Sequence, residues 1–167
     1  MRIGPGTEHH LQAINLIYNH YVAVSHATFD VEPWSQAQRE DWFSHYAESG
    51  RYRLLVAESA AEGVVGFATS SPFRPRRAYE TSVETSIYLH PEHLAAGIGS
   101  DLYRILLSAL EEEDVHRAYG CISLPNPGSV ALHQKLGFRF VGTFGEQGRK
   151  FGRYWDVAWF ERPVPHR

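Results

Sequence analysis

The stretch LAAGIGSDLYRILLSAL, residues 94–110, places two glycines one residue apart directly before a helical pattern. A Gly-x-Gly step lets the backbone come close to a ligand, and the start of a helix offers unpaired N–H groups and the positive end of a dipole. The stretch therefore predicts an anion site, suited to a phosphate, where the helix begins. A tight turn without a ligand is the alternative that this pattern leaves open.

A predicted strand lies on each side of this helix. TSVETSIYLH (residues 81–90) ends at a proline, and AYGCISL (residues 118–124) follows a helix predicted from Ile98 to Glu113. A strand–helix–strand unit favours a parallel strand pair, and its strand-to-helix turn is where ligands collect in α/β sheets. The helix stripe predicted to face the core consists of Leu102, Ile105, Leu106, Ala109 and Leu110.

The other patterns predict further helices and antiparallel strands. Apolar residues at helical spacing predict a helix between Thr7 and Val22, and Ser35 with Gln38 at capping-box spacing begins a second helix over residues 35–49. We therefore expect an α+β fold with a mixed, mostly antiparallel central sheet and helices on both faces. The remaining segments predicted to form strands are 52–59, 63–71 and two within 139–163.

Composition narrows the class of protein. A chain of 167 residues with 43% hydrophobic content predicts one domain over residues 1–167. The net charge of −3 argues against a nucleic-acid partner, which usually selects a strongly basic face. No apolar run is long enough to cross a membrane, and the N-terminal residues lack the apolar core of a signal peptide, so we expect a cytoplasmic protein.

Several site classes do not match the sequence. The turn GIGSDL lacks the third glycine of a dinucleotide fingerprint and the Lys-Ser or Lys-Thr of a Walker loop. The histidines in HH (residues 9–10) and HPEH (residues 90–93) have no acidic or cysteine partners at ligand spacing, so no metal is expected. Cys121, the one cysteine, lies in a predicted buried strand and is expected to be a packed side chain rather than a nucleophile.

Three segments, ETSIYLHPEH (84–93), LAAGIGSDLY (94–103) and NPGSVALHQKLGF (126–138), resemble the core signature of the GNAT acetyltransferases. The resemblance implies acetyl-CoA as co-substrate, with its pyrophosphate at the glycine turn and its pantetheine arm along the preceding strand. The chain departs from the family at Leu94, Ala95 and Ala96, where Gln, Arg, Gly or Thr are usual, but backbone N–H donors need no particular side chain. The implied cofactor-binding residues are Ile87, Tyr88, Leu89, Ala95, Ala96, Gly97, Ile98, Gly99, Ser100 and Asn126.

Six segments more narrowly resemble the phosphinothricin N-acetyltransferase branch of this family. The resemblance implies acetyl transfer from acetyl-CoA to the α-amine of a small amino-acid-like acceptor such as phosphinothricin or methionine sulfoximine. A polyamine or a protein N-terminus as acceptor, or a non-catalytic sensor of acyl-CoA, stay open as alternatives. The six segments are IYNHYV (17–22), ATFDVEPWS (27–35), PFRPRRAY (72–79), VETSIYLHP (83–91), ALHQKLGF (131–138) and GRKFGRYWDV (148–157).

Acetyl transfer requires a neutral amine, a stabilised oxyanion and a proton for the leaving thiolate. Glu84 shares a strand face with Ser86 and Tyr88, and the resemblance implies that it is the base, directly or through water. A solvated strand carboxylate is the alternative. His133 stands where many GNAT enzymes carry a tyrosine, so it can protonate the thiolate or position the amine, or be a satisfied surface histidine.

The acceptor side is predicted in the loop PFRPRRAY. Guanidinium groups of Arg74 and Arg76 suit a carboxylate or phosphinate, and the resemblance adds Tyr79 and the aromatic Phe29. A solvated basic loop is the alternative reading of the arginines. The aromatic C-terminal run RYWDVAWFERP and the resemblance both favour a homodimer, whose second chain can contribute to the acceptor pocket.

Overall fold

The computed structural model describes residues 1–166 and gathers seven strands into one sheet with the order β1-β2-β3-β4-β5-β7-β6. Neighbouring strands pair antiparallel except β4 and β5, which are parallel, so the predicted α+β sheet is confirmed. The strands are β1 (Arg2–Pro5), β2 (Leu54–Ser59), β3 (Gly63–Pro72), β4 (Ser82–Leu89), β5 (Arg117–Ser123), β6 (Arg139–Lys150) and β7 (Arg153–Pro163). The helices are α1 (Leu11–Val24), α2 (Gln36–Phe43), α3 (Ile98–Leu110) and α4 (Pro127–Lys135).

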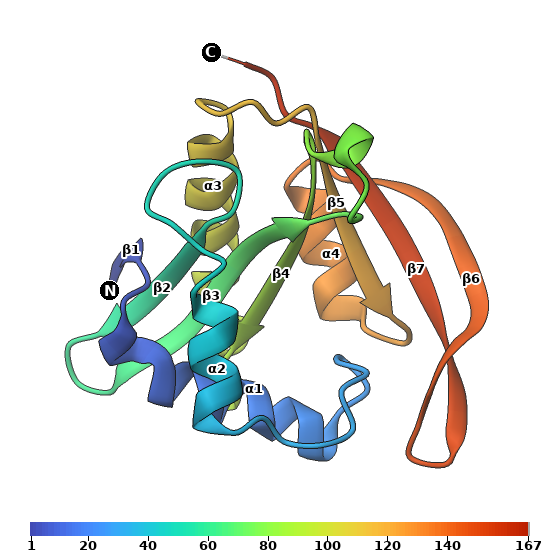
Figure 1. Ribbon diagram of the computed structural model, residues 1–167. Helices are drawn as coiled ribbons and strands as arrows, with labels where there is room; N and C mark the ends of the chain where they lie inside the picture. The colour runs from blue at the N-terminus through green and yellow to red at the C-terminus, as the bar shows by residue number, and fades with distance from the viewer. Residues whose placement is uncertain (167) are drawn as a thin grey trace.

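Helices cover both faces of the sheet (Figure 1). Alternate residues of β2 divide the core between them, because successive side chains of a strand point to opposite faces. Leu55 and Ala57 join a buried cluster with α3, whereas Leu54 and Val56 pack with α1. The sheet is therefore buried on both sides at its centre.

The helix that follows the glycine turn is the main helix of the first core cluster. Leu102, Leu106 and Leu110 are fully buried on it, as the apolar stripe predicts. The prediction was wrong for Ile105, which is 42% exposed, because the buried face turns instead toward Tyr103 and Leu107. A helix has 3.6 residues per turn, so a small rotation exchanges one edge of the stripe for the other.

The two parallel strands separate halfway along their length. Residues 82–85 of β4 pair with residues 117–120 of β5, and no pairing joins the strands beyond Thr85 and Gly120. β4 nevertheless continues to Leu89, paired with β3, and β5 continues to Ser123, paired with β7. The predicted parallel pair is confirmed, and its separation opens the centre of the sheet.

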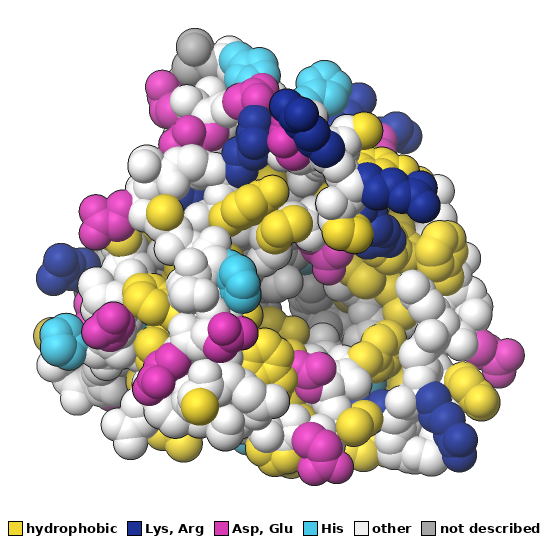
Figure 2. Space-filling model, viewed as in Figure 1, with side chains coloured by type: hydrophobic (Ala, Val, Ile, Leu, Met, Phe, Trp, Pro, Cys, Tyr) yellow, Lys and Arg dark blue, Asp and Glu magenta, His cyan; other side chains and the backbone are white. Residues whose placement is uncertain are grey.

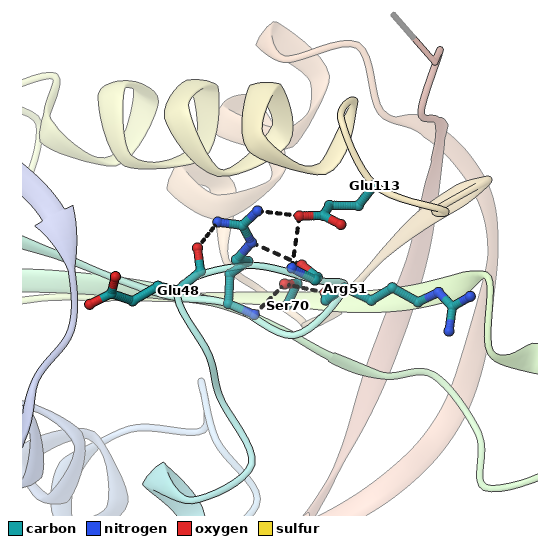
Figure 3. A network of polar contacts seen from close by, with 6 residues as sticks. Glu48, Arg51, Ser70 and Glu113 are labelled. Atoms are coloured by element: carbon teal, nitrogen blue, oxygen red, sulfur yellow. Dashed lines mark hydrogen bonds and ion pairs between the residues drawn. The ribbon is translucent and has the colours of Figure 1, made fainter.

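A polar network ties the segment before β2 to the rest of the fold (Figure 3). The Arg53 guanidinium lies 2.5 Å from the Glu113 carboxylate, and the Gly50 N–H donates to the same carboxylate at 2.7 Å. The Arg53 N–H donates to Ser70 Oγ, and Ser70 Oγ donates to the Arg51 carbonyl. The network links three parts of the chain: the turn that follows α3, the segment before β2, and strand β3 itself.

Two local predictions differ from the structure in length. The helix that begins after the Ser35 and Gln38 capping box ends at Phe43 rather than near residue 49. The lead segment Arg2–Pro5, for which no strand was predicted, pairs antiparallel with β2 as an edge strand. Four residues carry too short a pattern to identify a strand, and only the neighbouring β2 backbone provides its hydrogen bonds.

Candidate active site

The separation of β4 and β5 produces a cavity of about 660 Å³, within the size range of small-molecule sites. Figure 2 shows the molecule hollowed over the gap between these two strands. The cavity is lined by residues 85–89 of β4 and 121–123 of β5, by parts of the 94–100 turn and of α4, and by residues 25–27 beyond α1. Segments far apart in the sequence therefore meet at one site.

One end of the cavity is the start of α3. Gly97 is the N-cap residue, with a left-handed φ of 83°, and a Cβ at this position would have no heavy atom within 4 Å. The first N–H groups of an α-helix have no partner within the helix, so their open side can receive an anion. The Lys135 ammonium lies 3.3 Å from Ser100 Oγ and adds positive charge beside this helix start.

The lining includes most of the predicted cofactor residues. Those that line the cavity are Ile87, Tyr88, Leu89, Ala95, Gly97, Gly99, Ser100 and Asn126. Ala96 is not among the lining residues, and Ile98 is buried in the first core cluster. The Asn126 side chain accepts a hydrogen bond from the Ser129 N–H at 3.1 Å, so it also caps α4. Lys135 was missed because a lysine in a short helix carries no pattern that identifies it.

Glu84 lies on β4, opposite Ser71 on one side and Tyr119 on the other. It is half-buried, and burial raises the pKa of its carboxyl while the charge of Arg74 lowers it. A raised pKa makes a carboxylate a stronger base near neutral pH. Glu84 therefore has the electrostatic setting of a proton acceptor rather than of a solvated strand residue.

Aromatic rings gather beside Tyr119, the residue of β5 that lies opposite Glu84. The Phe73 ring stacks on Tyr119, with centroids 4.3 Å apart, and the Arg74 guanidinium lies 4.4 Å from the Phe73 centroid and 5.6 Å from that of Trp159. A cation over aromatic faces keeps its charge available for an anionic ligand group. Arg74 lies in this aromatic cluster, and its positive charge acts on the Glu84 carboxylate.

The other predicted acceptor residues, Arg76, Tyr79 and Phe29, lie in two loops. The Tyr79 ring meets the edge of Phe73 at 5.9 Å, and Arg76 is the exposed residue before the short turn Arg77–Tyr79. Phe29 lies in the segment between α1 and α2, where a Cβ on Gly148 would come within 2.3 Å of its ring. The glycine in β6 therefore leaves room for Phe29.

His133 is buried, with 3% exposure, so it is not the surface histidine that was one alternative. Its Nδ1 lies 2.8 Å from the Ser129 carbonyl, which only accepts, so Nδ1 carries the hydrogen. Burial lowers the pKa of His133, so the neutral ring is favoured, and Nε2 faces the Tyr103 hydroxyl at 3.4 Å. Gly120 makes this packing possible, because a Cβ there would lie 2.5 Å from the imidazole.

The prediction for Cys121 was half right. Its side chain is exposed and lines the cavity, so the expectation of a packed, buried residue was wrong. Although the side chain is exposed to the cavity, the protein around the cavity reduces solvation of the thiolate. Together with the Glu84 charge, this raises the pKa of Cys121 to about 12, which disfavours the nucleophilic thiolate. On β5, Ala118 and Ile122 face the core, and Cys121 points to the opposite side.

One histidine of each of the segments HH (9–10) and HPEH (90–93) lies beside a glutamate. His10 lies 3.3 Å from Glu58, and His93 lies 2.9 Å from Glu62. Among residues 1–166, no group of three or more histidine, cysteine, aspartate or glutamate side chains has an arrangement that could hold a metal ion. Within the same residues, no helix combines the length and apolar character needed to span a membrane.

Comparison with known proteins identifies the family of this chain. The model of the Acetyltransferase (GNAT) domain matches residues 6–159, which is most of the chain. The chain belongs to the GNAT acetyltransferase family. The resemblance stated from the sequence is thereby confirmed.

Individual GNAT relatives are similar over nearly the whole chain. Phosphinothricin N-acetyltransferase of Streptomyces coelicolor is 50% identical over 165 residues, covering 98% of this chain and 96% of that protein. L-methionine sulfoximine/L-methionine sulfone acetyltransferase of Pseudomonas paraeruginosa is 32% identical, covering 90% and 87%. The crystal structure of a GNAT superfamily phosphinothricin acetyltransferase from Sinorhizobium meliloti in complex with AcCoA has a TM-score of 0.93, at 34% identity, covering 98% and 88%.

Proposed function

We propose that this GNAT chain transfers an acetyl group from acetyl-CoA to the α-amine of a small amino-acid-like acceptor such as phosphinothricin or methionine sulfoximine. The observation that carries the proposal is the cavity between β4 and β5, which reaches from the glycine-capped start of α3 to Thr85 and Cys121, next to Glu84. One end suits an anionic cofactor, and the other suits an acceptor with an amine and an acid group. The names of the relatives agree with this acceptor class.

The cofactor is proposed to occupy the cavity with its pyrophosphate at the N–H groups of residues 97–100 and its pantetheine arm beside β4. The backbone of β4 beyond Thr85 has no β5 partner, so an extended arm can pair with it as an added strand would, except at the Leu89 carbonyl, which accepts from the Tyr21 hydroxyl. Lys135 supplies a positive charge near the phosphates, where Leu94, Ala95 and Ala96 provide none. The AcCoA complex of the Sinorhizobium meliloti relative supports the choice of cofactor.

In the proposed reaction Glu84 accepts a proton from the acceptor ammonium, directly or through water. The neutral nitrogen then attacks the thioester carbonyl to give a tetrahedral adduct. The C–S bond breaks as the adduct collapses to the amide, and the proton that the nitrogen loses passes to the CoA thiolate, which leaves as the thiol. Arg74 attracts the carboxylate or phosphinate of the acceptor, with Arg76, Tyr79 and Phe29 assigned to the same pocket. The positions of Arg74 and Glu84 orient the amine toward the base and the acid group away from it.

His133 is proposed to position the site rather than to protonate the thiolate. In the neutral ring the Nδ1 hydrogen is donated to the Ser129 carbonyl, so Nε2 has no proton to give. The ring instead packs beneath Gly120 of β5 and against Tyr103 of α3, at the edge of the cavity. It thereby holds α4 and α3 against the separated strand.

An assay of thiol release from acetyl-CoA with a panel of amines tests the proposed function. Phosphinothricin and methionine sulfoximine are expected to react with kcat/KM at least about 100-fold above spermidine or a plain alkyl amine, because only the former offer an acid group to Arg74. A higher rate with spermidine or with a peptide N-terminus would favour the alternative acceptors. Tight CoA binding with no thiol release from any amine would favour the sensor.

A homodimer is part of the proposal and rests on the β6–β7 hairpin. Five large apolar side chains on it are more than half exposed, an unusual density for a monomer surface. Light scattering at micromolar concentration is expected to give twice the chain mass of 19.0 kDa. Phe144→Glu is expected to yield the monomer mass. Leu16→Glu, at an exposed position of α1, is expected to leave the dimer intact. A monomeric wild type would refute the dimer. The five residues are Phe140, Val141, Phe144, Phe151 and Tyr154.

A further inference from the structure

Lys150 is a buried cation at the end of β6. The residue is 3% exposed, and its ammonium group lies 2.7 Å from the Ser25 carbonyl, 2.8 Å from the Thr28 carbonyl and 3.5 Å from that of Tyr21. An ammonium group has three N–H donors, and here each faces a backbone carbonyl of one segment. Burying a charge is costly unless it is fully hydrogen-bonded, so this arrangement is specific rather than incidental.

The three carbonyls belong to the end of α1 and to the loop of residues 25–30 that follows it. The last carbonyls of a helix carry the negative end of its dipole, so a cation there is favourable. The Tyr21 carbonyl already accepts from the Ser25 N–H at 3.0 Å, so the carbonyls of Ser25 and Thr28 are the closer acceptors for Lys150. The carbonyl of Thr28 lies beyond the helix, directly before Phe29. Lys150 therefore joins the helix end and the loop to one point of β6.

The position of Lys150 is itself fixed by the hairpin. Phe151 and Gly152 follow with φ of 53° and 73°, the pattern of a tight two-residue turn between β6 and β7. The Trp155 indole donates to the Lys150 carbonyl at 2.9 Å. The same Trp155 ring stacks on His26 of the 25–30 loop, with centroids 4.0 Å apart and planes 3° from parallel. The hairpin thus contacts the loop through both side chains.

A second anchor holds the loop from α1. The Tyr18 hydroxyl donates to Asp30 at 2.5 Å and lies 2.8 Å from Thr28 Oγ1. Phe29 is the residue between these two anchored positions, and its ring packs where Gly148 of β6 has no side chain. Tyr18 holds side chains of the loop, as Trp155 holds the His26 ring, whereas Lys150 holds the backbone carbonyls of Ser25 and Thr28. The carbonyl of His26 accepts separately from Ser123 Oγ.

We propose that Lys150 is a positioning residue for the acceptor, because its ammonium group fixes the 25–30 loop and so holds Phe29 in the shape that binds the acceptor. This inference rests on the proposed function, which assigns Phe29 to the acceptor pocket. The N–H groups of residues 97–100, which are assigned to the cofactor phosphates, lie on a different element. Residues 25–27 of the loop also line one side of the cavity, but the phosphate contacts at residues 97–100 and the contacts along β4 do not depend on the loop. Loss of Lys150 is therefore expected to affect the acceptor, through Phe29, more than the cofactor.

The test compares Lys150→Met with Arg149→Met, a neighbouring exposed cation on β6 that has no part in the proposed site. In the ligand-free protein, the amide hydrogens of Ser25, Ala27 and Asp30 are expected to exchange at least about 10-fold faster in K150M, because the loop opens more often. Amides of α3 are expected to be unchanged. R149M is expected to match the wild type throughout.

Kinetics complete the test. The KM for phosphinothricin is expected to rise about 10-fold or more in K150M, with the Kd of acetyl-CoA within about 3-fold of wild type. Lys150→Arg, which keeps a cation and N–H donors, is expected to show a smaller rise than K150M. A general loss of stability would instead change both substrates and the α3 amides together. If K150M does not fold, Lys150→Gln, which retains an N–H donor, undergoes the same measurements.

The outcomes separate this inference from the proposed function. Unchanged loop exchange in a folded variant overturns the anchoring role of Lys150, whatever the activity. Faster exchange with an unchanged acceptor KM overturns its positioning role. A wild-type protein that acetylates no amine contradicts the proposed function, while the exchange measurement still decides whether Lys150 holds the loop.

Discussion

Replacing Glu84 with glutamine is expected to lower kcat for acetyl transfer to phosphinothricin by about 100-fold or more, the usual effect of losing a general base. Glutamine has nearly the same shape but cannot accept the ammonium proton. Calorimetry is expected to give an unchanged Kd for acetyl-CoA, because Glu84 is not among the residues that line the cofactor cavity. Steady-state assays of thiol release measure the first effect.

Glu80→Gln is the matched control, since Glu80 is an exposed carboxylate at the end of the short turn before β4. It is expected to keep wild-type turnover. Full activity of E84Q would remove Glu84 as the base. An equal loss in both variants would show instead that the rate depends on the overall negative charge near the acceptor.

The pH profile provides a second readout for the same carboxylate. Only deprotonated Glu84 is a base, so kcat/KM falls as the pH drops through its pKa. Burial raises this pKa, so the acid limb is expected above the ordinary range of a glutamate. The positive charge of Arg74 lowers the pKa, so Arg74→Met is expected to move the limb to higher pH. An unmoved limb would separate Arg74 from the base.

Replacing Gly97 with aspartate is expected to weaken CoA binding by about 100-fold or more, or roughly 2.7 kcal/mol. Gly97 caps the start of α3, and the space around its missing Cβ is open. A carboxylate there competes for the free N–H groups and repels the pyrophosphate. Calorimetric titration with CoA measures the effect, which should decrease as salt screens the charges.

Gly97→Asn is the control for backbone strain. The φ of 83° disfavours most side chains, but asparagine and aspartate tolerate a left-handed conformation about equally and have the same shape. G97N is therefore expected to bind CoA within about 5-fold of wild type, a loss of roughly 1 kcal/mol or less. Equal losses in the two variants would attribute the effect to shape and remove the electrostatic role of the helix start.

Local patterns alone identified most of the elements. The capping box before α2, the apolar stripe of α3 and the glycine turn depend on neighbours within a few residues, and each is visible in the chain. The strand–helix–strand unit likewise indicated the parallel β4–β5 pair. The match of several separated motifs to one family extended these patterns to a fold and an activity, since one glycine pair is compatible with many proteins.

Side-chain environments could not be predicted in the same way. Cys121 lies in an apolar run typical of a buried strand, yet it faces the cavity because β5 leaves β4 one residue earlier. Ile105 fits the helical stripe, yet a small rotation of α3 exposes it. His133 titrates near neutral pH in water, but burial beneath Gly120 favours its neutral form.

The sequence by itself determined where most of the helices and strands lie, which turn is suited to an anion and which family the motifs resemble, because these depend on residues close together in the chain. Only the tertiary structure decided that β4 and β5 separate, that Arg74 influences the pKa of Glu84, and that Lys150 reaches the end of α1. Burial and charge act between residues that are distant in the chain, so these properties arise only when the sheet brings those residues together.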